Sequence, residues 1–172
     1  LCRRLSRDFT LTVLTRNPHQ KAYRLKTLAN AGYLSIVQGS IFDEDKLRNL
    51  IRKAEIVINL VGVLNETGKG NSFENIHTNF PNLVSKLCNQ YKTEQFIHIS
   101  ALGIEKASDS KYAQSKINGE KKIRENFPRV TIVKPSLIFS VSDSLTTKFM
   151  KLLTFLPIFP LYYEGKTKFA PI

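Results

Sequence analysis

The sequence predicts an α/β fold in which helices cover a doubly wound parallel sheet, and two features of the chain carry this prediction. Short, β-branched apolar runs alternate with longer segments of helical spacing, an order typical of β-α-β units with right-handed crossovers. The run at 56–61 lacks the polar alternation of a half-exposed strand, which indicates burial on both faces of a parallel sheet. With 172 residues, 42% of them hydrophobic, the chain suits one domain with its own core.

Each element has its own local signal. The apolar, β-branched runs predict strands at 10–15, 34–37, 56–61, 95–99 and 130–133. Helical spacing of apolar residues predicts helices at 21–31, 43–51, 72–91 and 110–125. Gly32 ends the first of these helices, whereas Asp43 and Ser72 cap the starts of the next two. Residues 1–7 match either an arginine-rich transit segment or, as we favour, the second half of an amphipathic helix.

The chain is strongly basic, with 26 basic and 14 acidic residues and a formal net charge of +12. Such an excess suits nucleic acid, anionic lipid or phosphorylated ligands. The basic residues are scattered, however, and do not alternate with aromatic residues as in RNA-binding segments. We therefore expect no nucleic-acid partner and keep a basic surface binder of nucleic acid or anionic lipid as a minor alternative.

Cysteine and histidine usage limits two further classes of site. Cys2 and Cys88 form no C-x-x-C motif, so we expect a reducing compartment and a protein that is not secreted. The three histidines share no metal-ligand spacing, and no metal is expected. His98 alternates within a predicted strand, which favours a hydrogen-bonded sheet residue over a ligand.

Ser100, Tyr112 and Lys116 form the most informative functional pattern. Ser100 ends a predicted strand, and Tyr112 and Lys116 lie one helical turn apart on the same face. A lysine ammonium beside a phenol favours the phenolate and lowers its pKa from about 10. Such a pair would exchange a proton with a carbonyl or alcohol while the serine hydroxyl binds the substrate oxygen. The alternative is an exposed Tyr/Lys helix surface without chemistry.

Two neighbouring signals bear on this pattern. Gly119 lies inside the same predicted helix, where glycine costs about 1 kcal/mol relative to alanine, so we expect close packing against a neighbouring element. Tyr162 and Lys166 repeat the spacing, but they flank Gly165 shortly after Pro160, where no regular helix is expected. We interpret that second pair as a coincidence.

Arg16 and Gly62 follow two predicted strands and suggest a nucleotide. In a dinucleotide-binding fold the end of such a strand meets the adenosine ribose, where arginine accommodates a 2′-phosphate. The sequence therefore favours NADP(H) over NAD(H). Gly62 would let a cofactor approach the backbone. The alternatives are a solvated arginine and a plain turn.

The apolar stretch at 149–163 is too short and too interrupted by proline to span a bilayer. We expect a helix packed on the domain, followed by an irregular segment. The alternative is an apolar surface for a partner or a membrane-peripheral contact.

Taken in order, these residues resemble the short-chain dehydrogenase/reductase superfamily. The resemblance is to its atypical, NAD-dependent epimerase/dehydratase-like branch, which contains the large NADPH-binding accessory subunit of respiratory complex I (NADH:ubiquinone oxidoreductase). The segments that carry it are 13–18, 59–64, 96–103, 112–116, 119–120, 127–128, 131–136 and 165–167. They extend over essentially the whole chain.

The resemblance implies roles for individual residues. Tyr112 would be the general acid/base, Lys116 would lower its pKa and bind the nicotinamide ribose, and Ser100 would polarise the substrate oxygen. The residues implied to line the cofactor are Arg16, Ser40, Ile41, Leu60, Val61 and Gly62 on the adenosine side, and Lys116 and Pro135 on the nicotinamide side.

The resemblance also implies a Rossmann-like sheet that is incomplete in this chain. The family's first strand and its glycine-rich loop, G-x-x-G-x-x-G, would come before Leu1, and the family continues beyond Ile172. We therefore expect residues 1–172 to form a single incomplete NAD(P)-binding domain, lacking the first strand and the glycine-rich loop and truncated before the C-terminal part. That strand is central in the family, so the strands at 10–15 and 56–61 should leave a gap between them. By itself, such a piece should bind NADPH weakly or not at all.

The expected function is that of an accessory or assembly component of respiratory complex I with a structural NADPH. Its partners would be complex I subunits, and its place would be peripheral, on the mitochondrial matrix side or the cytoplasmic side of a bacterial inner membrane. The alternative is an active NADP(H)-dependent oxidoreductase or sugar-nucleotide epimerase/dehydratase, because Ser100, Tyr112 and Lys116 are all present.

Overall fold

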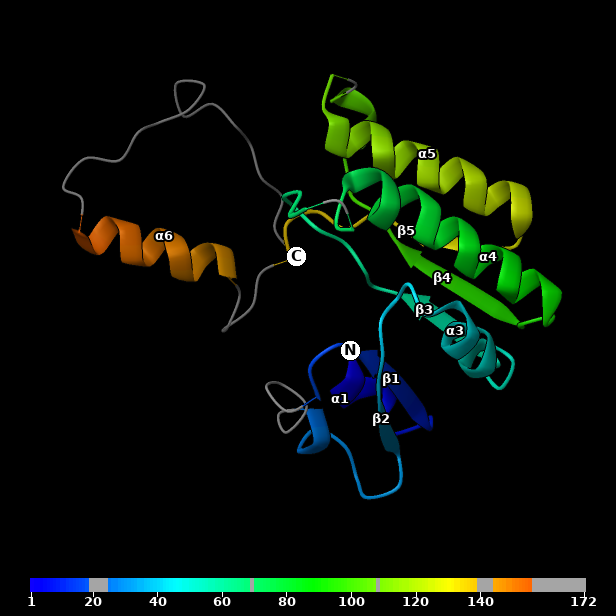
Figure 1. The fold of residues 1–172 in the computed structure, drawn as a ribbon. Coiled ribbons are helices and arrows are strands. Elements are labelled where there is room, and N and C mark those ends of the chain that lie inside the picture. Colours follow the sequence, from blue (N-terminus) through cyan, green and yellow to red (C-terminus); the bar gives the residue numbers. More distant parts are fainter. Residues whose placement is uncertain (19–24, 69, 108, 139–143, 156–172) are drawn as a thin grey trace.

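The computed structural model describes residues 1–18, 25–68, 70–107, 109–138 and 144–155 (Figure 1). Strands and helices alternate along the chain, which confirms the predicted α/β class. The elements in order are α1 (Cys2–Leu5), β1 (Leu11–Thr15), β2 (Leu34–Gln38), α3 (Glu44–Ile51), β3 (Ile56–Asn59), the π-helix η1 (Glu74–Asn79), α4 (Phe80–Gln90), β4 (Gln95–Ile99), the 3-10 helix η2 (Ile104–Lys106), α5 (Lys111–Asn126), β5 (Thr131–Val133) and α6 (Ser144–Phe155).

The described strands form two parallel sheets rather than one. β1 pairs with β2, and β4 lies between β3 and β5 in a separate three-stranded sheet. Among the described residues β1 and β3 do not pair, and Figure 1 shows the two sheets apart. The expected gap between these strands is therefore confirmed.

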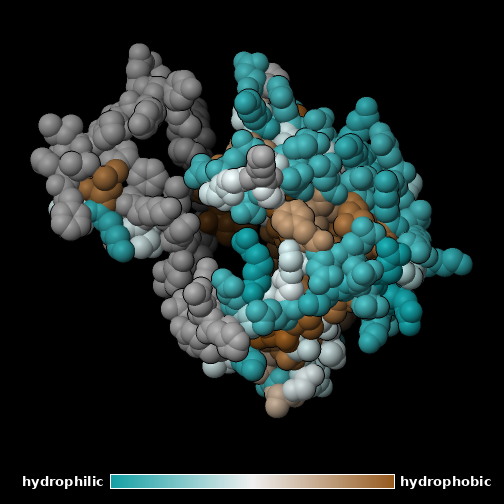
Figure 2. Space-filling model, viewed as in Figure 1, coloured by the Kyte–Doolittle hydropathy of each residue, from teal (hydrophilic) through white to brown (hydrophobic). Residues whose placement is uncertain are grey.

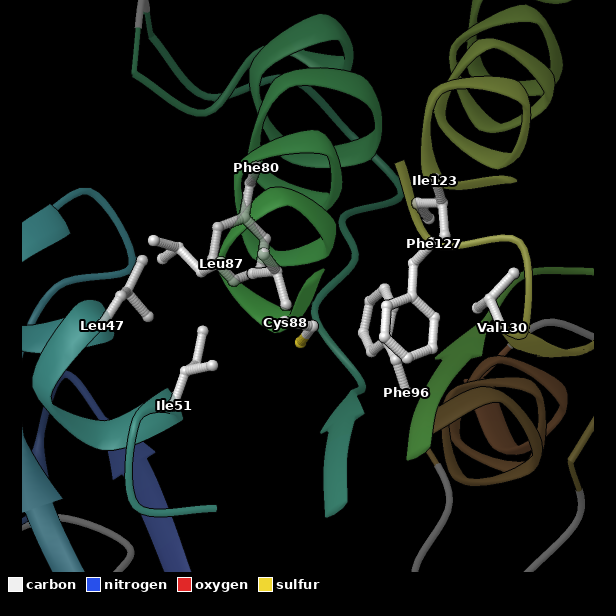
Figure 3. Packing of buried hydrophobic residues seen from close by; sticks show 10 residues of the cluster. Leu47, Ile51, Phe80, Leu87, Cys88, Phe96, Ile123, Phe127 and Val130 are labelled. Atoms are coloured by element: carbon white, nitrogen blue, oxygen red, sulfur yellow. The ribbon is translucent and has the colours of Figure 1, made fainter. Parts of the chain in front are cut away.

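Among the described residues, a buried hydrophobic cluster lies between the helices and the strands. Phe96 of β4 is fully buried and meets Phe127 edge-on, with 6.2 Å between the ring centroids. The other members are Leu47, Ile51, Phe80, Val84, Leu87, Cys88, Ile123 and Val130 (Figure 3). Leu14 of β1 and Val57 of β3 pack against the same cluster, so both sheets share one helical layer.

The opposite face of the three-stranded sheet is open among the described residues. Ile56 is 39% exposed and Val133 is 41% exposed. The expectation that the 56–61 strand is buried on both faces is therefore wrong. This strand also ends at Asn59 rather than at residue 61, because the Asn59 side chain accepts a hydrogen bond from the Val61 backbone and turns the chain.

The expected helix at 72–91 is a π-helical turn followed by an α-helix. Ser72 caps it as predicted, since its hydroxyl accepts from the Asn75 backbone N–H at 3.2 Å. Pro81 has no backbone N–H to donate to the carbonyl of His77, so the α-helical pattern fails at this point. The wider turn absorbs the difference, as single π turns do near functional sites.

The other helix signals agree with the structure where it describes them. Asp43 accepts from the Lys46 backbone at 3.0 Å, and α5 begins after its cap, Ser110. The outer face of α4 and α5 is hydrophilic in Figure 2, as expected for helices whose inner faces are packed. Cys2 and Cys88 are both free. Residues 21–24 of the predicted 21–31 helix and the Tyr162–Lys166 pair lie outside the described residues. Within 25–31 only Leu25 and Lys26 are helical, so the predicted helix ends earlier than expected.

The apolar stretch at 149–163 is described only as far as residue 155. In α6, Met150 is 69% exposed and Leu153 is 56% exposed, and Figure 1 shows this helix away from both sheets. The expectation that this helix packs on the domain is therefore wrong for its described side chains. Among the helices of the described ranges, none combines the length and apolar character needed to cross a lipid bilayer.

Candidate functional site

The predicted site residues follow the carboxyl ends of the strands. Arg16 follows β1, Ser40 and Ile41 come two and three residues after β2, and the loop at 60–62 follows β3. Ser100 follows β4, and Pro135 comes two residues after β5. In parallel α/β sheets ligands bind at this edge, outside the carboxyl ends of the strands. The predicted residues that follow strands therefore lie at the carboxyl edge of each sheet, as expected from their positions in the sequence.

Tyr112 and Lys116 lie on α5, but each has its own surroundings. The Tyr112 ring meets His77 edge-on at 5.1 Å between centroids and Phe73 at 5.7 Å. The Lys116 side chain is only 5% exposed, and its ammonium donates to the carbonyl of Ile99 at 3.3 Å. The helix therefore brings the pair into one region while the lysine head group turns toward the end of β4.

The electrostatics of the pair differ from the expectation. Burial raises the pKa of Tyr112 above its ordinary value. Burial also lowers the pKa of Lys116, with an opposing effect from Glu120. The lysine charge lowers the pKa values of His77 and His98, in each case after the larger effect of burial. The prediction that Lys116 lowers the pKa of the phenol is therefore wrong for this arrangement.

Ser100 is buried and already hydrogen-bonded within the protein. Its hydroxyl lies 2.5 Å from Oε1 of Glu120, to which it donates. The other Glu120 oxygen lies 2.9 Å from the Lys134 ammonium, which also pairs with Glu105. These two acidic partners, Glu105 first, raise the pKa of Lys134. Because Ser100 is only 5% exposed, its proton is directed to a fixed carboxylate rather than outward.

Sequence reasoning missed His77, which connects three segments of the site. Its Nε2 accepts from the Val63 backbone N–H at 3.1 Å, and its Nδ1 lies 3.0 Å from the Ser115 hydroxyl. Ser115 in turn donates to the carbonyl of Tyr112 at 2.7 Å. Burial, and next the charge of Lys116, lowers the His77 pKa to about 4. Histidine spacing gave no sign of this role, because the partners come from distant parts of the chain.

Asn59 and His98 form a second buried pair. The Asn59 side-chain oxygen accepts from Val61, so its amide nitrogen is the donor to His98 Nδ1, 3.1 Å away. Within the described residues His98 Nε2 has no hydrogen-bond partner. The expectation of a hydrogen-bonded sheet residue is therefore correct for one ring nitrogen only. The signal was available in the sequence, since Asn59 interrupts an otherwise apolar strand.

Two glycines of the site differ in the space that is available for a side chain. A Cβ at Gly119 would stand 1.9 Å from the carbonyl oxygen of His77, which confirms the predicted close packing. A Cβ at Gly62 would stand 3.6 Å from the Lys116 ammonium, an ordinary contact distance. The protein therefore requires glycine at 119, whereas a Cβ at 62 would meet Lys116 and His77 at ordinary contact distances.

The predicted adenosine side is more exposed. Arg16 is exposed, and its carbonyl accepts from the Gln38 side chain at 3.5 Å. Ser40 accepts from the Phe42 backbone at 3.1 Å, so its hydroxyl stabilises the local turn. Ile41 lines a pocket of about 280 Å³, close to the lower limit for small-molecule sites. Asn79 and Phe80, at the junction of η1 and α4, also line this pocket.

The part of the chain that the structure describes contains no cluster of metal-ligating side chains. There, no group of three or more histidine, cysteine, aspartate or glutamate side chains is arranged to hold an ion. The predicted site instead contains a phenol and an ammonium from α5, an arginine that follows β1, and the backbone N–H groups of the loops. Such donors suit ribose hydroxyls and phosphates.

Curated relatives of the chain are mitochondrial proteins. NADH dehydrogenase [ubiquinone] 1 alpha subcomplex subunit 9, mitochondrial, of Mus musculus is 33% identical over 149 residues, which cover 86% of this chain and 39% of the relative. The NADH-ubiquinone oxidoreductase 40 kDa subunit, mitochondrial, of Neurospora crassa is 26% identical over 145 residues, covering 84% and 38%. The chain thus spans about two-fifths of the length of these relatives.

Solved structures show the same fold at low sequence identity. The Bordetella bronchiseptica enzyme WbmH in complex with NAD+ has a TM-score of 0.69 at 15% identity, with 87% of this chain and 56% of that chain covered. UDP-glucuronic acid 4-epimerase from Bacillus cereus in complex with NAD has a TM-score of 0.64 at 18% identity, covering 80% and 52%. These neighbours confirm the Rossmann-like fold class and the epimerase/dehydratase-like architecture.

A family model provides the last comparison. The model described as NAD(P)H-binding matches residues 1–150, which is most of the chain. This match agrees with the parallel strands, with the polar groups at their carboxyl ends, and with the relatives above. The chain belongs to the NAD(P)H-binding family.

Proposed function

We propose that this chain is the NAD(P)(H)-binding part of an accessory or assembly component of respiratory complex I, in which NADPH serves a structural role. Membership of the NAD(P)H-binding family and the two mitochondrial relatives support the general assignment. The more specific proposal is that the protein binds the cofactor without turning over a substrate. The hydrogen bonds and the burial of the three predicted catalytic residues support it.

The interaction of Ser100 with Glu120 is the observation that carries this proposal. A serine that activates a substrate oxygen must direct its proton toward the ligand, whereas Ser100 donates to a buried carboxylate. Burial raises the pKa of Tyr112, which disfavours the phenolate needed for proton abstraction at neutral pH. The Lys116 ammonium is held by the carbonyl of Ile99. Each group retains its binding capacity, but the set is not prepared for proton transfer.

The residues of this chain fit part of a dinucleotide. Gly62 lies beside the Lys116 ammonium, and the pocket beside Ile41 offers an apolar wall of the kind that an adenine ring needs. In this proposal Arg16 pairs with a 2′-phosphate and favours NADP(H) over NAD(H). The adenosine would lie along Ser40, Ile41, Leu60, Val61 and Gly62, and the nicotinamide ribose near Lys116 and Pro135. When bound, the cofactor itself would supply hydride chemistry.

The proposed partners are other subunits of complex I, and the proposed location is peripheral to the mitochondrial inner membrane on the matrix side, or to a bacterial inner membrane on the cytoplasmic side. The exposed apolar side chains of α6 support a partner or membrane contact through the 149–163 stretch. We also infer that residues 1–172 form one incomplete domain, because Leu14 and Val57 from the two sheets pack on one core.

The direct test is removal of the protein from its own cell. Loss of the gene should reduce assembled complex I on native gels and reduce NADH:ubiquinone activity in parallel. A Tyr112→Phe copy should restore assembly, because a structural role needs the ring contacts with His77 and Phe73 but not the phenolic proton. Unchanged assembly and activity in the deletion strain would overturn the proposal. A purified complex that contains no NADPH would overturn the structural cofactor alone.

An active NADP(H)-dependent oxidoreductase or sugar-nucleotide epimerase/dehydratase is the second candidate. The observation in its favour is that Tyr112 and Lys116 lie together on α5 beside the loop after β3. In that case Tyr112→Phe should abolish turnover of some NADPH-linked substrate while leaving cofactor affinity intact. Equal turnover by the variant and the natural protein with every such substrate tested would exclude this candidate.

A further inference from the structure

We propose that His77 is a positioning residue that ties the loop after β3 to the helix bearing Tyr112 and Lys116, and so fixes the spacing of Gly62 and Lys116. The inference deepens the proposed function, because the ligand that would feel this spacing is the dinucleotide. In the proposed role His77 itself contacts neither a substrate nor a cofactor. It acts through Val63 on one side and through Ser115 on the other.

The position of His77 is set by the backbone around it. His77 lies in the π-helical turn, four residues before Pro81, and its carbonyl stands against the backbone of Gly119. Thr78 adds a hydrogen bond from its hydroxyl to the Ser115 carbonyl at 2.9 Å. The contact between η1 and α5 is therefore backbone against backbone, which leaves the His77 ring little freedom to move.

The hydrogen bonds specify one tautomer of His77. A backbone N–H can only donate, so Nε2, which faces Val63, must be unprotonated. The neutral ring then carries its proton on Nδ1 and donates it to the Ser115 hydroxyl. The Ser115 hydroxyl in turn donates a hydrogen bond to the carbonyl of Tyr112. Each donor in this series of three hydrogen bonds has an acceptor, so the connection from the loop to the helix is complete.

Ring contacts hold His77 on its remaining sides. Phe73 stacks on the imidazole at 5.6 Å between centroids, with the planes 15° apart. Tyr112 meets both rings nearly perpendicularly, at 88° to His77 and 80° to Phe73. Such edge-to-face contacts are favourable between aromatic rings. A shift of His77 would therefore move Tyr112 as well as the loop.

Among the described residues, segment 60–63 of the loop after β3 has two hydrogen bonds to side chains, and only one of them connects it toward α5. Asn59 binds Val61 from within the same strand end, whereas His77 binds Val63 from η1. Gly62 lies between these two anchors, within reach of both Lys116 and His77. Removing the imidazole would leave the loop attached to its own strand at Val61 and to the Phe73 backbone at Glu66. Gly62, which lies between these two attachments, could then shift away from Lys116. A ligand that bridges the two would then bind less tightly.

The experiment uses the full-length natural protein and three substitutions of one residue. His77→Phe keeps the ring and loses both hydrogen bonds. His77→Gln places an amide near the position of Nε2 and can still accept from Val63, whereas His77→Asn reaches only toward Ser115. We expect His77→Phe and His77→Asn to weaken NADPH binding about tenfold in a fluorescence titration, and His77→Gln to recover most of the loss. Val84→Ala, a buried substitution in α4, serves as the stability control and should leave NADPH affinity unchanged.

Measurements without cofactor separate this inference from the proposed function. A ¹H–¹⁵N correlation spectrum of the imidazoles should show His77 protonated at Nδ1, and ultraviolet titration should show a shifted Tyr112 phenol in His77→Phe. If both hold but the natural protein binds no NADPH, the proposed cofactor fails and the positioning role stands. If the natural protein binds NADPH and His77→Phe binds it equally well, the positioning role fails and the proposed function stands. A spectrum showing protonation at Nε2 also overturns the inference.

Discussion

The two-stranded part of the molecule and the three-stranded part are built from the same kind of parallel β-α units, yet they differ in how they are stabilised. β4 contains the fully buried Phe96, which belongs to one core cluster with side chains of α4 and α5. In β1 and β2, by contrast, every residue is intermediate or exposed. Both parts reach one core, but the three-stranded part supplies most of it (Figure 3).

The predicted functional residues divide along the same line. Ser100, Tyr112 and Lys116 belong to the packed part. Ser100 and Lys116 donate hydrogen bonds to protein oxygens, and the Tyr112 ring packs against His77. Arg16 and Ser40 belong to the exposed part and make only short local contacts. The comparison teaches that the geometry around the tyrosine is fixed before any ligand arrives, whereas the predicted adenosine side has less support from the rest of the protein.

The largest effect is expected for Gly119→Ala in the packed part. The new Cβ would overlap a backbone oxygen of His77, so η1 and α5 would have to separate. We expect a loss of about 4 kcal/mol or more in the free energy of unfolding, measured by urea denaturation. Gly70→Ala is the matched control, because nothing lies within 4 Å of its Cβ position. Equal stability of the two variants would show that η1 and α5 are not closely packed.

The buried histidines predict acid sensitivity of the packed part. His77 and His98 have pKa values of about 4 in the folded protein against an ordinary 6.5, mainly through burial. As pH falls below 6.5, the unfolded chain takes up protons that the folded chain cannot, so stability falls through this window. The full loss is on the order of 3 kcal/mol per histidine near pH 4. Chemical denaturation between pH 7 and 5, above the range of ordinary carboxylates, tests this, and a flat profile would contradict it.

A serine in each part gives a third, smaller comparison. Ser100→Ala removes the buried donor to Glu120 and should cost about 2 kcal/mol in the free energy of unfolding. Ser40→Ala removes an exposed turn contact and should stay within about 0.5 kcal/mol of the natural protein. Thermal unfolding of the two variants measures the difference. Similar losses would mean that the exposed part is more tightly held than its burial indicates.

The smallest expected effect concerns Arg16 and only one of two cofactors. If this arginine meets a 2′-phosphate, Arg16→Ala should weaken NADPH binding about tenfold, and NADH binding by less than about twofold. Isothermal titration with both nucleotides distinguishes the cases in the full-length protein. Arg48→Ala is the control, since that exposed guanidinium pairs with Glu44 on α3. Parallel losses for both nucleotides would remove the argument for NADP(H).

Much of the fold was accessible from the sequence because its signals are local. Asp43 and Ser72 act as caps by bonding to a backbone N–H three residues ahead, and Ser110 does the same for α5. The separation of β1 from β3 was expected from the resemblance and is present. The π-helical turn was missed, because the spacing of apolar residues does not reveal a wider turn before Pro81.

The candidate site was predicted less completely, and the misses share a cause. The tyrosine–lysine spacing placed both residues on α5, but the direction of the lysine head group depends on the carbonyl of Ile99, which is distant in sequence. The raised pKa of Tyr112 depends on burial in the folded structure. His77 was overlooked because Val63 and Ser115 lie 14 and 38 residues away along the chain.

By itself, the sequence determined the order of the strands and of the helices α3, α4 and α5, the placing of polar residues at strand ends, and the need for a close neighbour at Gly119. These follow from backbone periodicity, capping and the conformational cost of glycine, which act within a few residues. Only the tertiary structure decided which groups are hydrogen-bonded to each other: Ser100 to Glu120, and Val63 to His77. Hydrogen bonds and burial act over a few ångströms, so they are set when distant segments pack together.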